Sequence, residues 1–125
     1  MIAAPTDAAA ALQRCHPDAK VIDGTDPPVI EVPGVLLPAG WSEASTTIWF
    51  VVPAGYPAAQ PDCFWADASL RLAGGGMPQN SGLQAVASTG VPGLWFSWHL
   101  QSWRPGRDDL VTYTRFILRR LADAR

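Results

Sequence analysis

A serine and a histidine two residues apart are the side chains of this sequence best suited to chemistry. Ser97 and His99 lie in an aromatic segment, Trp95-Phe96-Ser97-Trp98-His99-Leu100. In an extended chain they share one face, while the apolar residues around them share the other. A hydroxyl becomes a strong nucleophile when a base removes its proton, and histidine is the commonest such base. The spacing suits that chemistry if the segment is extended, and it equally suits two hydrogen-bonded loop residues.

The two cysteines of the chain, Cys15 and Cys63, lie in different local contexts and form no Cys-x-x-Cys motif. We expect both to be reduced thiols, with Cys63 in the core because the apolar pattern of its predicted strand suggests burial. Together with His16 and His99 they show no spacing typical of a structural zinc site. The sequence therefore predicts no metal and no cofactor.

Composition limits the classes of function. The chain has 125 residues, of which 16% are charged, and its formal net charge is −2. This charge gives no sign of binding to nucleic acid or to an anionic membrane. Its 12 prolines and 11 glycines exclude an all-helical bundle. The longest apolar run, residues 48–52, is too short to span a bilayer, and no basic signal sequence is evident at the N-terminus. We expect one cytoplasmic domain over residues 1–125.

The pattern predicts an α+β fold made of an N-terminal helix, a four-stranded antiparallel meander, a long irregular segment and a C-terminal helix. Residues 1–17 form the N-terminal helix region, in which Thr6 or Asp7 caps the helix, and residues 18–123 form the core. β-Branched and aromatic residues favour strands over four ranges. These ranges are 20–23, 29–32, 46–52 and 62–65. Residues 67–93, rich in glycine and small polar residues, are expected to be irregular.

The final helix is predicted from Leu110 to about Ala122, with Asp108 or Asp109 as its N-cap. Its apolar residues recur at helical spacing and form one stripe. They are Leu110, Tyr113, Ile117 and Leu121. Three arginines near the helix end, Arg115, Arg119 and Arg120, are expected to be solvated, where positive charge suits the helix dipole.

Four motifs, in order, resemble those of the prokaryotic ubiquitin-conjugating-like family E, a bacterial relative of ubiquitin-conjugating (UBC) enzymes. The first is Pro-Ala-Gly-Tyr-Pro-Ala-Ala-Gln-Pro-Asp-Cys-Phe at residues 53–64, and the second is Asp-Ala-Ser-Leu-Arg-Leu at residues 67–72. The third is Ser97-Trp98-His99, and the fourth is Trp-Arg-Pro-Gly-Arg-Asp-Asp-Leu at residues 103–110. The resemblance spans residues 28–121 and implies a UBC-like fold with its active site in the irregular segment.

This sequence departs from the usual UBC pattern at its nucleophile. UBC enzymes carry a cysteine shortly before the Trp-x-Pro motif, where Trp95 stands here, and a His-Pro-Asn motif upstream, where Asp67-Ala68-Ser69 stands. A thioester at the usual place is therefore excluded. Within the resemblance, Ser97 becomes the candidate nucleophile, His99 its general base, and Asn80 a possible donor to an oxyanion.

The resemblance implies three partners: a ubiquitin-like protein, an adenylating activating enzyme and a JAB-family metalloprotease, in a setting such as antiphage defence. The expected partner-binding residues are Tyr56, Pro57, Trp95, Trp103 and Arg104. Packing the last helix onto the sheet is the simpler role for Trp98 and Trp103. Trp95 is a candidate for lining the groove of an extended, glycine-rich tail.

The leading hypothesis is a transferase that receives the ubiquitin-like protein as an oxyester and passes it to a target. The missing cysteine motivates an alternative, an inactive UBC-like scaffold that binds the same partners without forming a bond. A free-standing Ser/His hydrolase is a third hypothesis. It lacks a Gly-x-Ser-x-Gly elbow, and the sequence offers no evident acidic residue to orient the histidine.

Overall fold

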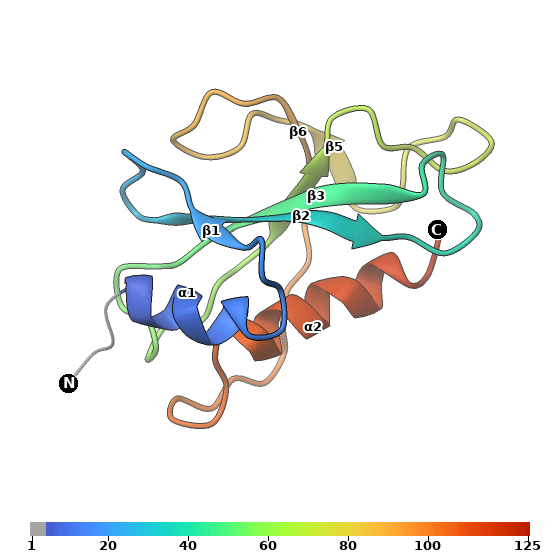
Figure 1. The fold of residues 1–125 in the computed structure, drawn as a ribbon. Coiled ribbons are helices and arrows are strands. Elements are labelled where there is room, and N and C mark those ends of the chain that lie inside the picture. The colour runs from blue at the N-terminus through green and yellow to red at the C-terminus, as the bar shows by residue number, and fades with distance from the viewer. Residues whose placement is uncertain (1–4) are drawn as a thin grey trace.

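The computed structural model describes residues 5–125 as an antiparallel sheet of six strands with two helices on one face (Figure 1). The strand order is β1-β2-β3-β4-β6-β5. The strands are β1 (Lys20–Val21), β2 (Val29–Leu36), β3 (Ser45–Val51), β4 (Phe64–Asp67), β5 (Ser81–Leu83) and β6 (Gly93–Phe96). The helices are α1 (Pro5–Gln13) and α2 (Leu110–Leu121). No helix of this part of the chain is long and apolar enough to cross a membrane.

The predicted α+β class is confirmed, whereas the predicted number of strands is wrong. The first four strands follow one another as the expected meander, but β5 and β6 extend the sheet from a region that was expected to be largely irregular. The β5 sequence is Ser-Gly-Leu, which has little intrinsic strand preference. It is extended because its backbone pairs with β6, whose register places Gly82 opposite Trp95.

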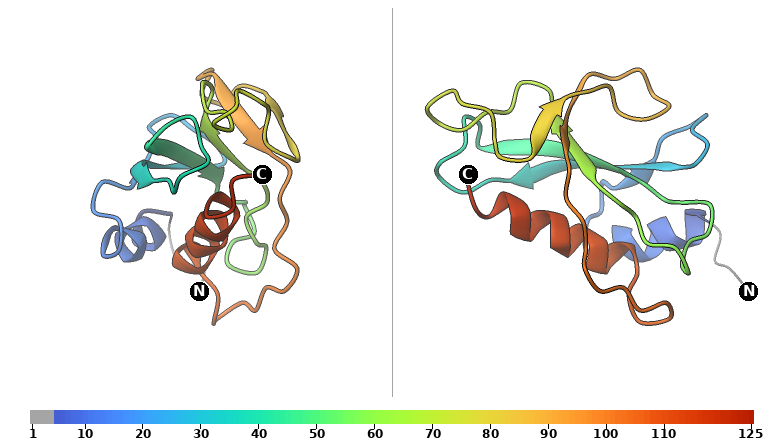
Figure 2. Two further views of the ribbon diagram at one scale, coloured as in Figure 1. Left: turned by 90° about the vertical axis from the view of Figure 1, so that its right-hand side faces the viewer. Right: turned by 180° about the vertical axis from the view of Figure 1, so that it is seen from behind.

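The main core lies between the sheet and the two helices, which Figure 2 shows on the same face of the sheet. Alternate residues of the central strands, such as Ile30 and Phe50, are fully buried there. The predicted apolar stripe of α2 faces them, and each of its four residues is at most 1% exposed. Phe50 and Tyr113 join the layers through rings whose centroids lie 5.3 Å apart.

The helix ends agree in part with the sequence prediction. Asp109, one of the two predicted caps, accepts a hydrogen bond from the backbone N–H of Thr112 at 3.1 Å and completes a capping box. The first helix begins at Pro5, so the backbone of Thr6 and Asp7 lies within its first turn and not at the N-cap position. Proline is favoured at this position because its fixed φ suits a helix and its missing N–H costs no bond.

A smaller apolar cluster covers the opposite face of the sheet. It consists of Val29, Trp49, Trp65 and Val86, with Trp95 packed against it. The 84–92 loop folds over this face and is held by the backbone N–H of Val86, which donates to the carbonyl of Val91 at 2.8 Å. Both faces of the central strands are therefore covered, which explains their continuous apolar sequence.

Arg120 is buried, in contrast to the prediction that the arginines at the helix end are solvated; its exposure is 2%. Its guanidinium donates hydrogen bonds of 2.8–3.0 Å to the carbonyls of Gln79, Asp123 and Arg125. It also lies 5.2 Å from the ring centroids of both Phe96 and Trp98. Desolvation by burial lowers the pKa of Arg120 below its ordinary value. Arg120 therefore links α2 to the segment that carries the candidate chemistry.

We expect the Arg120→Met variant to be less stable than the wild type by about 1–3 kcal/mol, because hydrogen bonds from a charged donor are lost. The measurement is urea unfolding followed by tryptophan fluorescence. Arg115→Met, on the exposed face of the same helix, serves as the control and should change stability by less than about 0.5 kcal/mol. Equal effects of the two substitutions would contradict a structural role for Arg120.

Candidate active site

Two segments that are distant in sequence meet where β4 begins and β6 ends. The strands pair with Phe64 opposite Phe96, and the contact continues past the strand ends. The backbone N–H of Cys63 donates to the carbonyl of Trp98 at 3.1 Å, and the side chain of Gln60 donates to the carbonyl of Leu100, also at 3.1 Å. Residues 60–63 therefore run beside residues 97–100 in a fixed register.

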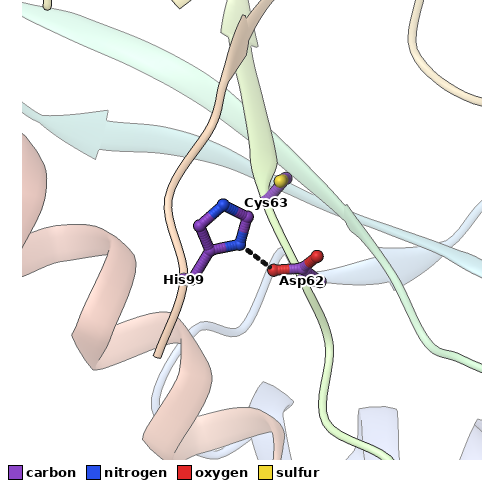
Figure 3. Close-up of side chains that lie close together, drawn as sticks. All are labelled: Asp62, Cys63 and His99. Carbon is purple, nitrogen blue, oxygen red and sulfur yellow. Dashed lines mark hydrogen bonds and ion pairs between the residues drawn. The ribbon is translucent and has the colours of Figure 1, made fainter. Parts of the chain in front are cut away.

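This register places three polar side chains in a line. The Ser97 hydroxyl lies 3.3 Å from His99 Nε2, and Asp62 Oδ1 lies 2.5 Å from His99 Nδ1. Figure 3 shows the His99 ring directed at Asp62. A carboxylate that accepts from Nδ1–H fixes the tautomer in which Nε2 is free to accept a proton from serine. Ser97, His99 and Asp62 therefore lie in the order of a serine nucleophile, its general base and the carboxylate that orients the base.

Asp62 is the site residue that the sequence reasoning missed. The expectation of no acidic orienter is wrong, because Asp62 lies 37 residues before His99 and reaches it only through the β4–β6 contact. Its position at the end of the Pro53–Phe64 motif was the available signal, but nothing in linear spacing relates that motif to the Ser-x-His segment.

The prediction that Ser97 and His99 share a face is confirmed by their contact. The residues between and beside them, Phe96, Trp98 and Leu100, belong to the core or pack against it. Trp98 stacks on Phe116 of α2 with ring centroids 6.4 Å apart. This packing restrains the backbone, so the opposite face of the segment presents the hydroxyl and the imidazole together.

The line of side chains lies on an open surface. The side chains of His99 and Asp62 are 52% and 58% exposed. Two hollows of the described surface, one of about 450 Å³ around Leu83 and one of about 400 Å³ around Phe116, are lined by other residues. Sites for small molecules usually enclose most of their ligand. This geometry instead suits a reacting group that a macromolecule presents.

Asn80 lies next to Ser97 through backbone pairing. Its carbonyl accepts the hydrogen bond of the Ser97 N–H at 2.8 Å, and its own backbone has a left-handed φ of 62°. The backbone N–H of Ser97 is therefore already occupied, and the side chain of its pairing neighbour Asn80 is exposed. Its role as an oxyanion donor stays a prediction.

The loop with the Tyr-Pro motif supports the chain between the site and α2. The buried Tyr56 hydroxyl accepts from the backbone N–H of Leu110 at 3.1 Å, and its burial raises the pKa of this phenol. Trp103 Nε1 donates to the carbonyl of Pro57 at 2.8 Å. Tyr56 therefore positions the helix start from inside, while Pro57 and Trp103 are only partly buried.

Trp95 packs on the sheet, whereas Arg104 lies in the turn before α2. Trp95 packs on the sheet face away from the helices, beside Trp49 and Trp65. Arg104 is exposed, and its backbone N–H donates to the carboxylate of Asp108 at 2.7 Å in the turn before α2. Partner binding by these residues stays a prediction.

Cys63 is buried, as predicted, but its side chain lies beside Asp62 and His99 (Figure 3). Its backbone has φ 61°, a left-handed conformation that is rare for residues other than glycine and asparagine. The hydroxyl of Tyr113 donates to its carbonyl at 2.8 Å and helps to hold this conformation. Desolvation is the main cause that raises the pKa of the Cys63 thiol.

In this α+β domain the chain before β4 and the chain after β6 together present the Ser97–His99–Asp62 line, which is a candidate catalytic site. The chain belongs to the prokaryotic E2 family E, whose family model matches residues 18–124. The resemblance seen in the sequence is therefore correct, and membership assigns the chain a ubiquitin-conjugation-like role in prokaryotes. No curated protein and no solved structure matches the chain significantly.

Alkylation should distinguish the two thiols. Only the thiolate reacts, so the buried Cys63, whose pKa is raised, should react with iodoacetamide at pH 8 much more slowly than the exposed Cys15. Because the shift is upward, the rate at Cys63 should keep rising at pH values where that of an ordinary thiol levels off. Peptide mass spectrometry after timed quenching gives both rates. Equal rates in the folded protein would contradict this assignment.

Proposed function

We propose that this protein accepts the C-terminal acyl group of a ubiquitin-like protein on Ser97, as an oxyester, and transfers it to a target. The observation that carries the proposal is the Ser97–His99–Asp62 line in a member of an E2-like family. Trp95 stands where the usual cysteine would be, so another nucleophile is needed for a covalent intermediate.

The proposed first step balances without a cofactor. His99 Nε2 removes the Ser97 proton as Ser97 Oγ attacks the acyl carbon held by the activating enzyme. The bond from that carbon to its leaving group breaks, and the proton on Nε2 passes to the leaving group. Asp62 accepts from Nδ1–H throughout and stabilises the imidazolium.

In the second step an amine of the target attacks the oxyester carbon. The bond from this carbon to Ser97 Oγ breaks, His99 relays the amine proton to the departing serine oxygen, and an amide forms. Asn80, whose backbone carbonyl pairs with the Ser97 N–H, is the proposed source of the side-chain donor to the oxyanion that develops in both steps. The open surface around His99 leaves room for the target to approach.

The proposal includes a UBC-type arrangement of the surrounding chain. The Tyr56-Pro57 loop and the Trp103-Arg104 segment flank the site, as in the motif order of that fold. Pro57, Trp95, Trp103 and Arg104 are the proposed contacts for the activating enzyme and the ubiquitin-like protein. The proposed pathway also includes a JAB-family metalloprotease.

A hydrolase is a second candidate, favoured by one specific observation. Asp62 supplies the acidic orienter that the hydrolase hypothesis lacked. A hydrolase should release p-nitrophenol from p-nitrophenyl acetate repeatedly and without a partner protein. A transferase should show no more than one acylation per chain in the absence of its acceptor.

Incubation with activating enzyme, ATP and the ubiquitin-like protein should give a covalent adduct with wild type and none with Ser97→Ala. Ser102→Ala, at an exposed serine nearby, is the matched control and should form the adduct normally. Mild base should cleave the adduct, while a thiol reductant should leave it intact, because an oxyester resists thiols far better than a thioester. Denaturing gels and intact mass spectrometry provide the readout.

An adduct that persists in Ser97→Ala would contradict the serine assignment. Binding of the activating enzyme or the ubiquitin-like protein without an adduct, under these trapping conditions, would instead support the inactive scaffold.

The Asp62→Asn variant should slow adduct formation by roughly 10²–10⁴-fold, since the orienting acceptor for His99 Nδ1–H is lost. Asp23→Asn, at an exposed turn away from the site, is the control. Single-turnover rates at saturating activating enzyme measure the chemical step apart from binding. A rate equal to that of Asp23→Asn would show that Asp62 does not position the base.

A further inference from the structure

Three side chains at the site combine the donor types that bind transition metals. One carboxylate oxygen of Asp62, Cys63 Sγ and one ring nitrogen of His99 all lie within 4.8 Å of one another (Figure 3). Thiolate, imidazole and carboxylate are the ligands that proteins use for Zn²⁺. The serine acyl-transfer steps proposed above use no thiol, so Cys63 has no part in that chemistry.

The distances are close to those of a zinc site. Tetrahedral bonds of about 2.0–2.3 Å place neighbouring ligand atoms roughly 3.3–3.6 Å apart. The observed separations therefore need changes of about 1.5 Å at most, including a widening of the 2.5 Å contact between Asp62 and His99. Both of these side chains are more than half exposed, so they are free to rotate toward a metal.

Cys63, in contrast, is fixed in place. Its N–H donates to Trp98 and its carbonyl accepts from Tyr113, which together hold the backbone at φ 61°. This conformation strains the backbone of a cysteine, whereas a glycine would adopt it freely. A strained residue with a ligating side chain, aimed at a histidine and an aspartate, is the arrangement of a pre-positioned ligand.

We propose that Asp62, Cys63 and His99 bind Zn²⁺ and that the bound metal inhibits acyl transfer by leaving Ser97 without an acceptor for its proton. On binding, the Cys63 proton passes to solvent, a Zn–S bond forms, and the Asp62–His99 hydrogen bond is replaced by two bonds to the metal. A water molecule completes the four-coordinate site. The inhibitory part rests on the proposed function, whereas the metal binding does not.

Inhibition follows whichever ring nitrogen binds the metal. If Nε2 is the ligand, the base itself is occupied. If Nδ1 is the ligand, the remaining proton of the neutral imidazole sits on Nε2, which then donates to Ser97 and accepts nothing. In both cases Ser97 loses the acceptor for its proton.

Zinc and cobalt titrations of tag-free, reduced protein test the site. Isothermal titration with Zn²⁺ should give one ion per chain, and Co²⁺ should give a sulfur-to-cobalt charge-transfer band. Cys63→Ser should abolish this band and weaken Zn²⁺ binding by more than about tenfold. His99→Gln, at an exposed position that leaves the core intact, should weaken it similarly. Cys15→Ser, at the exposed cysteine beside His16, should bind as the wild type does.

Absence of Zn²⁺ binding, binding unchanged in both Cys63→Ser and His99→Gln, or binding lost in Cys15→Ser would each overturn the metal site. A second arm adds stoichiometric Zn²⁺ to the adduct assay. There the adduct should disappear and return after a chelator is added. Adduct formation by zinc-loaded protein would overturn the inhibition alone, and a metal-free protein that forms no adduct would overturn the proposed function alone.

Discussion

The candidate site depends on the pairing of β4 with β6. That register places Phe64 opposite Phe96, and just beyond the strands the bond from Cys63 N–H to the Trp98 carbonyl is offset from it by one residue. The stacked rings of Phe64 and Phe96, with centroids 4.6 Å apart, bury the contact. A shift of one residue would turn Ser97 and His99 toward the core, because neighbouring side chains point to opposite faces. One backbone register therefore decides whether the polar side chains meet.

In residues 97–100, one face packs against α2 and the other carries the polar side chains of the candidate site. Trp98 and the buried guanidinium of Arg120 hold it against α2, while its other face is solvated. A rigid backbone under an exposed histidine suits chemistry on a group that another protein delivers, since the fold itself encloses no substrate. Membership of the prokaryotic E2 family E agrees with a site that works on a group delivered by another protein.

Asp62, Cys63 and His99 lie so close together that His99 has two alternative roles, as the base for Ser97 or as a metal ligand. As a base it needs the carboxylate on one nitrogen and the hydroxyl near the other, and this arrangement is observed. As a metal ligand it would give up one of these contacts. A cation bound to this imidazole would prevent it from accepting the Ser97 proton, so the same ring would serve either catalysis or metal binding, but not both.

Local pattern was enough to predict much of the fold. The stripe on α2, its Asp109 cap, the central strands and the shared face of Ser97 and His99 all follow from spacing and propensity, which act over a few residues. The motif order was enough to identify the family. The tertiary structure alone decided the rest: β5 as a strand, the burial of Arg120, and the position of Asp62 and Cys63 beside His99. These features depend on pairing and packing between distant segments, whose energy appears only when the chain is folded.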